Sequence, residues 1–249
     1  MIRRGLARLW LGWVLFYGAL TVLAVYLPYR FIVWRWVPPK RFRIGLRLSK
    51  WWAKAVLIGA GIRLQVHHRN AYPPEQPYLL IANHRHELDI PISAVAAPVL
   101  FRFLAKHSLG RIPLLGWIID QMYILVDRGN RRSRFQAFLR LKQSIEMGIS
   151  VLIFPEGRRN RTNSPLLPFE PGAFRLAIDA GIPVIIMAIR GVNARLVRHN
   201  GRVVGFFPGT VEVITEMVPS QAHASEQALS TYAHSRMQQL LAEGTLSDA

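Results

Sequence analysis

The fold class is decided by one stretch, PYLLIANHRHELDIPISAVAA (residues 77–97). It starts with a short apolar run typical of a buried strand and ends with a helical pattern that Pro91 interrupts near its beginning. Two histidines and two acids lie between these parts, within sequence that otherwise resembles protein core. We therefore predict a strand-to-helix junction with polar side chains at the carboxyl end of the strand, where open α/β sheets bind ligands.

The same alternation of strand and helix patterns continues from residue 62 onward. Helices are predicted over residues 131–148 and 171–181, each ending at a glycine, and over residues 225–244, with Ser225 as N-cap and Gly244 as the stop. We expect an α/β fold with a mixed, mostly parallel sheet of about seven strands flanked by helices. The predicted strands lie within residues 62–68, 77–83, 99–106, 122–128, 150–156, 183–190 and 210–217.

Two of these helices have an expected apolar face. In the first, the face comprises Phe135, Phe138, Leu139 and Ile145. In the last, it comprises Leu229, Tyr232, Met237, Leu240 and Leu241.

The first 60 residues predict a membrane anchor. Residues 9–29 contain no charge and are long enough to cross a bilayer core, with Trp and Tyr toward both ends. Residues 40–62 are apolar with interspersed basic residues, which favours an amphipathic helix on anionic headgroups. Basic residues on both sides favour a monotopic two-helix anchor or a hairpin over a single span. A signal peptide and a buried helix of a soluble domain are the alternatives.

Charge and cysteine content narrow the function classes. The net charge is +18, and no acid precedes Glu75, whereas thirteen basic residues do. This predicts an anionic partner. Because the charge clusters around apolar sequence and no nucleic-acid-binding motif occurs, we expect a membrane surface and no nucleic acid. The absence of cysteine excludes disulfides, thiolate metal sites and cysteine nucleophiles.

His84 and Asp89 are the candidate catalytic pair. On one straight helix they would lie about 140° apart, so they can meet only if His84 lies in the loop and Asp89 in the first helical turn. An acid bound to Nδ1–H would leave Nε2 free as a base. His86 and Asp89, spaced i,i+3, form a rival pair. A metal site at His84 and His86 would lack further ligands, so we expect no metal.

A second motif is VLIFPEGRRN (residues 151–160), a strand pattern followed by an acid, a glycine and two arginines. Gly157 permits a positive φ or a close backbone approach, and Arg158 and Arg159 can bind a phosphate. Together, ANHRHELD and FPEGRR resemble the NHx4D and FPEGTR motifs of the glycerolipid acyltransferases, best known as 1-acylglycerol-3-phosphate acyltransferases. The resemblance covers roughly residues 55–215. Supporting segments follow in the same order: AKHSLGRIPLLGW (105–117), YILVDRG (123–129), PFEPGAF (168–174) and GIPVIIMAIRG (181–191).

This resemblance implies roles for individual residues. His84 would be the base that takes the acceptor's proton, oriented by Asp89. The acceptor's glycerol would lie at Glu156 and Gly157, and its phosphate at Arg159, Arg128 and Lys106. Arg158 stands where the family usually has Thr, Asn160 where Ser is common, and Met187-Ala188 replaces the second proline of a V-P-I-V-P-V block. The first two departures leave the acceptor headgroup open.

The resemblance also implies the reaction. An acyl group would pass from acyl-CoA or acyl carrier protein to lysophosphatidic acid, without a cofactor, at the inner or cytoplasmic membrane with the site facing the cytoplasm. Residues 1–60 would be the membrane anchor and residues 61–249 the acyltransferase domain. Alternatives are a related acceptor (lyso-ornithine lipid, another lysophospholipid or glycerol-3-phosphate) and a non-catalytic lipid-binding membrane protein.

Overall fold

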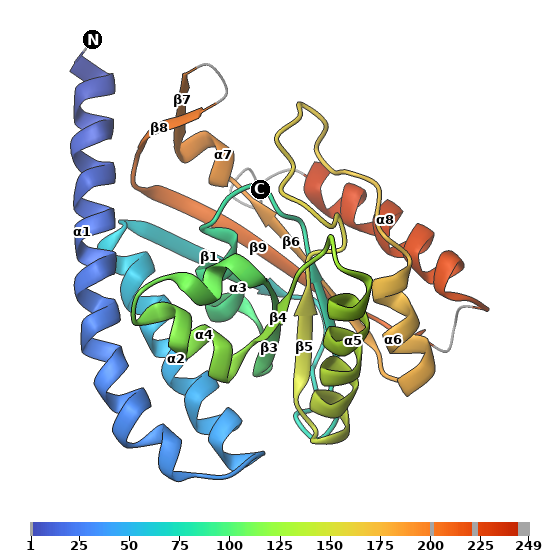
Figure 1. Cartoon of the computed structure of the whole chain (residues 1–249). Coiled ribbons are helices and arrows are strands. Elements are labelled where there is room, and N and C mark those ends of the chain that lie inside the picture. Colours follow the sequence, from blue (N-terminus) through green and yellow to red (C-terminus); the bar gives the residue numbers. More distant parts are fainter. Residues whose placement is uncertain (1, 200–201, 221–223, 244–249) are drawn as a thin grey trace.

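A computed structural model of the chain describes residues 2–199, 202–220 and 224–243 (Figure 1). Its central feature is a seven-stranded sheet in the order β1-β9-β6-β2-β5-β3-β4. The β6–β9 pair is antiparallel and all other neighbours are parallel. The predicted α/β class and mixed, mostly parallel sheet are thus confirmed. The strands are β1 (Ile62–His68), β2 (Leu79–Ala82), β3 (Phe101–Lys106), β4 (Ile124–Val126), β5 (Ser150–Ile153), β6 (Val184–Arg190) and β9 (Gly209–Val218).

One supersecondary element was not predicted. After the short helix α7 (Val192–Arg195), β7 (Leu196–His199) and β8 (Arg202–Phe206) form an antiparallel pair outside the main sheet. The two apolar runs are short and interrupted by arginine and histidine, which weakened the strand pattern. The Asn200-Gly201 dipeptide between them is a hairpin signal that the sequence did contain.

Helices cover the two faces of the sheet in separate groups (Figure 1). One face packs against α5 (Arg131–Glu146), α6 (Gly172–Ala180) and α8 (Glu226–Ala242), through a core that includes Leu79, Ile81, Leu141, Phe174 and Met237. The other face packs against α2 (Lys40–Gly59) and α3 (Asp89–Ala96), through a core that includes Leu80, Leu152, Leu57 and Ile92. Consecutive β2 residues enter opposite cores, as side chains alternate along a strand.

The expected apolar face of α5 is partly wrong. Phe135 is 59% exposed and Leu139 is 37% exposed, whereas Ala137, Leu141 and Ile145 are buried. The buried positions recur at i, i+4 and i+8, which defines the stripe facing the sheet. Phe135 and Leu139 each lie two positions before a buried residue, about 200° around the helix.

The predicted helix ends agree better with the structure. Gly148 and Gly181 both adopt positive φ just beyond their helices, and the Ser225 Oγ accepts the Ala228 N–H at 3.2 Å as an N-cap. In α8, Leu229, Met237 and Leu240 are buried as predicted, while Tyr232 is exposed. The stop predicted at Gly244 lies outside the described residues.

The N-terminal region consists of α1 (Ile2–Phe31), a short 3-10 helix η1 (Val33–Arg35) and α2. By length and composition, the segment 5–35 is apolar enough to cross a membrane, and it is the one such helix among the described residues. One side of α1 packs inward, with the Trp10 Nε1–H bonded to the Ala60 carbonyl at 3.2 Å. Its other side exposes Leu9, Leu15, Phe16, Leu20, Leu23, Leu27 and Phe31.

The α2 helix packs one side into the protein, and its predicted contact with headgroups stays a prediction. Its apolar stripe of Leu46, Ala53 and Leu57 is buried within the protein, so this stripe is not available to a bilayer. The basic residues Arg43 and Arg47 remain exposed. The division into an anchor of residues 1–60 and a domain of residues 61–249 stays a prediction, because both helices pack against the rest of the chain.

Candidate active site

The β2–α3 junction brings His84 and Asp89 together. The strand ends at Ala82, His84 lies in the loop, and Asp89 is the first residue of α3. The His84 Nδ1 lies 3.1 Å from the Asp89 Oδ2, and Asp89 is 1% exposed. The His84 ring stacks on Phe154, with ring centroids 4.1 Å apart. Nε2 has no hydrogen-bond partner in the described part of the chain, which leaves this nitrogen available as a base.

Asp89 has a second role in the junction loop. The same Oδ2 accepts the main-chain N–H groups of Arg85 at 2.6 Å and His86 at 2.7 Å. Asp89 therefore fixes both the imidazole and the loop that carries it. The ring of His86, the rival partner, instead accepts the Leu88 N–H at 3.2 Å and lies 3.4 Å from the Glu87 carboxylate.

The FPEG loop holds the main chain of His84. The buried Glu156 accepts the His84 N–H at 2.7 Å through Oε1 and the Leu167 N–H at 2.9 Å through Oε2. The Asn160 N–H donates to the His84 carbonyl at 2.7 Å. Both main-chain polar groups of the candidate base are therefore bonded to this one loop. Gly157, at φ +69°, allows the tight turn that brings Glu156 and Asn160 to the same side.

The Glu156 carboxyl is buried and bonded to the main chain of the site. Burial raises the pKa of the Glu156 carboxyl, and the hydrogen bonds from His84 and Leu167 counteract part of that rise. Each of the two carboxylate oxygens accepts one main-chain N–H group. The resemblance places Glu156 at the acceptor's glycerol. The contacts show that Glu156 holds the main chain of His84, and its role at the acceptor's glycerol stays a prediction.

Asn160 and Arg85 bind the loop that follows the FPEG turn. The Asn160 side chain, 1% exposed, accepts from Thr162 and donates to the Ser164 carbonyl at 2.8 Å. The Arg85 guanidinium donates to the carbonyls of Thr162, Ser164 and Pro165 at 2.7–3.1 Å. Asn160, a departure from the family pattern, thus organises this loop. The role of Arg85 had no signal in the sequence, because its carbonyl partners are 77–80 positions away and folding brings them close.

The predicted phosphate ligands lie at one edge of the sheet. Lys106 ends β3 and Arg128 follows β4, and both are exposed at the carboxyl ends of strands parallel to β2. Arg159 is half-buried and forms an ion pair with the exposed Glu87 of the junction loop. Of the three, Arg159 is the one in contact with the loop that carries His84. Arg158 is exposed.

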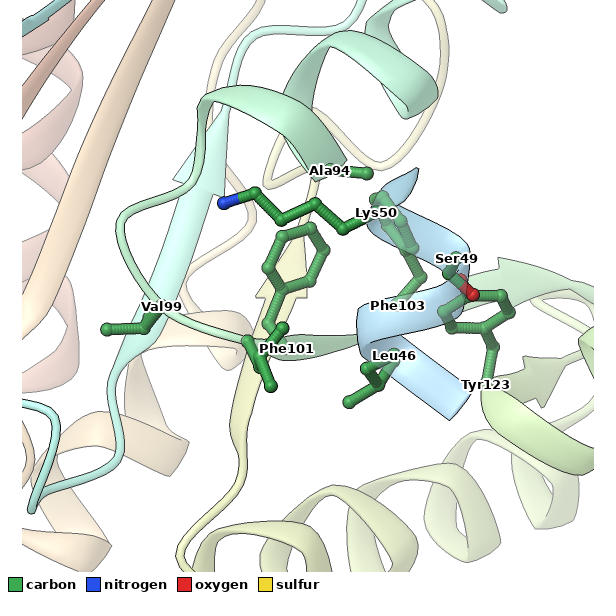
Figure 2. Close-up of a pocket in the computed structure, with 9 residues that line it drawn as sticks. Leu46, Ser49, Lys50, Ala94, Val99, Phe101, Phe103 and Tyr123 are labelled. Atoms are coloured by element: carbon green, nitrogen blue, oxygen red, sulfur yellow. The ribbon is translucent and has the colours of Figure 1, made fainter. Parts of the chain in front are cut away.

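A small, mostly apolar pocket lies where α2, α3 and β3 meet (Figure 2). Its wall includes Phe103, whose ring stacks toward Phe154, which in turn stacks on His84. The Lys50 ammonium donates to the Ala97 carbonyl at 2.8 Å, and burial lowers its pKa. Phe103 and Phe154 therefore lie between the pocket and the His84 imidazole. It is lined by Leu46, Ser49, Lys50, Ala94, Val99, Leu100, Phe101, Phe103 and Tyr123.

The sequence of this chain is similar to those of known acyltransferases. The Acyltransferase family model matches residues 63–190. A mouse 1-acyl-sn-glycerol-3-phosphate acyltransferase alpha is 33% identical over 178 residues, which are 70% of this chain and 58% of the mouse protein. A lyso-ornithine lipid O-acyltransferase of Pseudomonas aeruginosa is 31% identical over 190 residues, 70% of this chain and 71% of that protein.

A solved structure shares the fold. The crystal structure of the 1-acyl-sn-glycerophosphate acyltransferase PlsC from Thermotoga maritima is similar over 98% of both chains, with a TM-score of 0.76 and 23% sequence identity. The matched region spans about half the length of several curated relatives, such as 47% of a Chlamydomonas reinhardtii 1-acyl-sn-glycerol-3-phosphate acyltransferase. The Acyltransferase family model matches more than half of this chain, and the two sequence motifs meet at one site. The chain therefore belongs to the acyltransferase family.

Proposed function

We propose that this protein transfers a fatty acyl group from an acyl thioester to the free hydroxyl of lysophosphatidic acid, giving phosphatidic acid. The main support is the His84–Asp89 pair, in which Asp89 holds Nδ1 at 3.1 Å and leaves Nε2 available. Relatives named as 1-acyl-sn-glycerol-3-phosphate acyltransferases support this choice of acceptor.

The chemistry needs only a positioned base. His84 Nε2 removes the proton as the acceptor hydroxyl oxygen attacks the thioester carbonyl carbon. The new C–O ester bond forms, the C–S bond breaks, and His84 returns the proton to the leaving thiolate. A thioester is already activated, so no covalent enzyme nucleophile is required. The apolar pocket beyond Phe154 is the proposed site of an acyl chain.

Separate sets of residues would bind the acceptor and contact the membrane. Arg159 is the proposed phosphate ligand, with Arg128 and Lys106 as further cations at the same edge of the sheet. The exposed apolar side of α1 would enter the membrane that contains the lysolipid. We place the protein at the cytoplasmic membrane with His84 facing the cytoplasm, because acyl-CoA and acyl carrier protein are both soluble donors.

Lyso-ornithine lipid is a second candidate acceptor. Among the relatives described above, the P. aeruginosa lyso-ornithine lipid O-acyltransferase is matched over the larger share of its own length. The ion pair of Glu87 and Arg159 also offers both a carboxylate and a guanidinium next to the junction loop. Such a pair could bind the amino and carboxylate groups of an ornithine headgroup.

An acceptor panel tests these proposals. Purified protein would receive acyl-CoA and acyl carrier protein donors with lysophosphatidic acid, lyso-ornithine lipid, another lysophospholipid or glycerol-3-phosphate. We expect the highest kcat/KM with lysophosphatidic acid. Preference for another acceptor would change the assigned substrate, but the protein would still be assigned as an acyltransferase. Absence of transfer to every acceptor by folded protein would favour a non-catalytic lipid-binding role.

A further inference from the structure

The outer face of α5 carries a mixture of basic and apolar side chains. At about 100° per residue, six exposed residues fall within roughly 100° of one another around the helix, and one of them is an acid. The helix contains one acid, Glu146, at its last position. Packing does not account for this face, because α5 already buries Ala137, Leu141 and Ile145 against the sheet. We call the five basic or apolar members of this exposed set the α5 face: Arg131, Arg132, Phe135, Leu139 and Lys142.

The α5 face begins at the catalytic edge of the sheet. The helix follows β4, and Asn130 caps its first turn by accepting the Ser133 N–H at 3.0 Å. Since β4, β3, β5 and β2 are mutually parallel, the start of α5 and the His84 loop lie at the same edge (Figure 1). Arg131 and Arg132 therefore occupy the end of the face nearest the candidate site.

The α5 face lies on the opposite side of the sheet from the membrane helix. α5 packs into the core that contains Leu79 and Ile81, whereas Trp10 of α1 packs against the core that contains Leu80. Figure 1 shows α1 and α5 on opposite flanks of the molecule. A bilayer that takes up the exposed side of α1 therefore leaves α5 facing water, where a soluble partner can approach.

We propose that the α5 face docks an acidic acyl carrier protein that delivers the acyl thioester to His84. This inference rests on the proposed function and selects between its two donors. The arginines and Lys142 complement an acidic protein surface, and the net charge of +18 would steer such a partner toward the enzyme.

The apolar residues of the face favour a protein over acyl-CoA. Phosphates of CoA need cations, but they do not need an exposed Phe135 with Leu139 one turn further along. Aromatic and arginine side chains together are typical of protein–protein interfaces, where a few of them supply most of the binding energy. Phe135 would be the central anchor, surrounded by the cations.

The test compares two donors that carry the same acyl chain. Steady-state kinetics with acyl carrier protein and with acyl-CoA would be measured for the wild type, Arg131→Glu/Arg132→Glu and Phe135→Ser. We expect each variant to raise the apparent KM for the carrier protein about tenfold or more, equivalent to a loss of about 1.4 kcal/mol. The kcat and KM for acyl-CoA should stay within about twofold, because the α5 face lies outside the site.

Arg175→Glu is the matched control. Arg175 is an exposed arginine on α6, on the same side of the sheet but outside the α5 face, and it should change neither donor's kinetics. Added salt should weaken use of the carrier protein by the wild type more than by the charge-reversed variant.

Several results would overturn the inference. The variants could change the kinetics with both donors equally, or change the kinetics with neither donor. The wild type could use acyl-CoA but not the carrier protein, or the α5 variants could bind vesicles less well. Failure of the wild type with every donor would instead contradict the proposed function itself. The two failures are therefore distinguishable.

Discussion

The carboxylate of Glu156 accepts the main-chain N–H of His84 at 2.7 Å, so the FPEG loop holds the backbone of the candidate base. Asn160, four residues later, donates its N–H to the His84 carbonyl. Asp89 orients the imidazole from the other motif. The two motifs therefore form one structural unit, in which the second motif positions the histidine of the first.

Glu156→Gln should lower kcat more than it changes the acceptor KM. The amide oxygen can replace one carboxylate acceptor, but the amide nitrogen cannot accept from Leu167. We expect kcat to fall about tenfold or more, since small displacements of a catalytic group can cost up to about a hundredfold. Steady-state kinetics against the acceptor would show this. Glu170→Gln, an exposed glutamate on the same loop, is the control. A raised acceptor KM with unchanged kcat would return Glu156 to the acceptor's glycerol.

Glu156 should also affect how stability depends on pH. Burial raises the pKa of this carboxyl in the folded chain, so the folded state binds more protons there than the unfolded state does. Its contribution to the free energy of unfolding is therefore complete below the ordinary value of 4.5 and falls as pH rises through the raised pKa. Denaturant unfolding from pH 4.5 to 7 should show the wild type losing stability relative to Glu156→Gln. A relative gain over this range would be inconsistent with the burial of the carboxyl.

Arg159→Ala should mainly raise the apparent KM for an acceptor that carries a phosphate. Hydrogen bonds to charged groups contribute about 1.5–3 kcal/mol, which corresponds to a tenfold or larger increase in KM. Glu87→Gln removes the partner that competes for Arg159, and because that ion pair is exposed we expect at most about a fivefold decrease in KM. Arg158→Ala, which removes an exposed neighbour, is the control. If Arg158→Ala raised KM more than Arg159→Ala, the phosphate would have to be reassigned to Arg158.

The exposed side of α1 should determine membrane association. Leu15, Phe16 and Leu23 are more than half exposed and would each contribute about 1.5–3 kcal/mol if buried in lipid. Replacing all three with serine should weaken co-sedimentation with anionic vesicles more than about a hundredfold, while the fold is retained. Val25→Ala, on the packed side, should lower thermal stability instead. Unchanged vesicle binding by the triple variant would rule out this side of α1 as the anchor.

Local patterns were sufficient to predict much of the fold. The seven strands of the main sheet are short apolar runs that end in turn or polar residues, and each lies where its run occurs. The junction also followed from spacing, because a histidine and an aspartate five residues apart can meet only across a loop-to-helix bend. The predicted burial of Phe135, Leu139 and Tyr232 was wrong, since helical spacing alone does not reveal which apolar positions meet the sheet.

The interactions that support the site could not be predicted from the sequence. Glu156 reaches His84, and Arg85 reaches the carbonyls of residues 162–165, through pairing of β2 with β5 and the loops that follow them. These contacts join residues more than 70 positions apart. The chemistry of a carboxylate or guanidinium does not reveal whether its partner is a substrate or the main chain.

The most direct test of the central claim is acyl transfer by His84→Ala. The wild type and the variant would be compared with saturating acyl donor and lysophosphatidic acid, after thermal unfolding and vesicle binding have been shown to be equal. A positioned general base contributes about a hundredfold to ten-thousandfold to the rate. We therefore expect turnover to fall by at least about a hundredfold. Retention of most of the wild-type activity would contradict the assignment of His84 as the base.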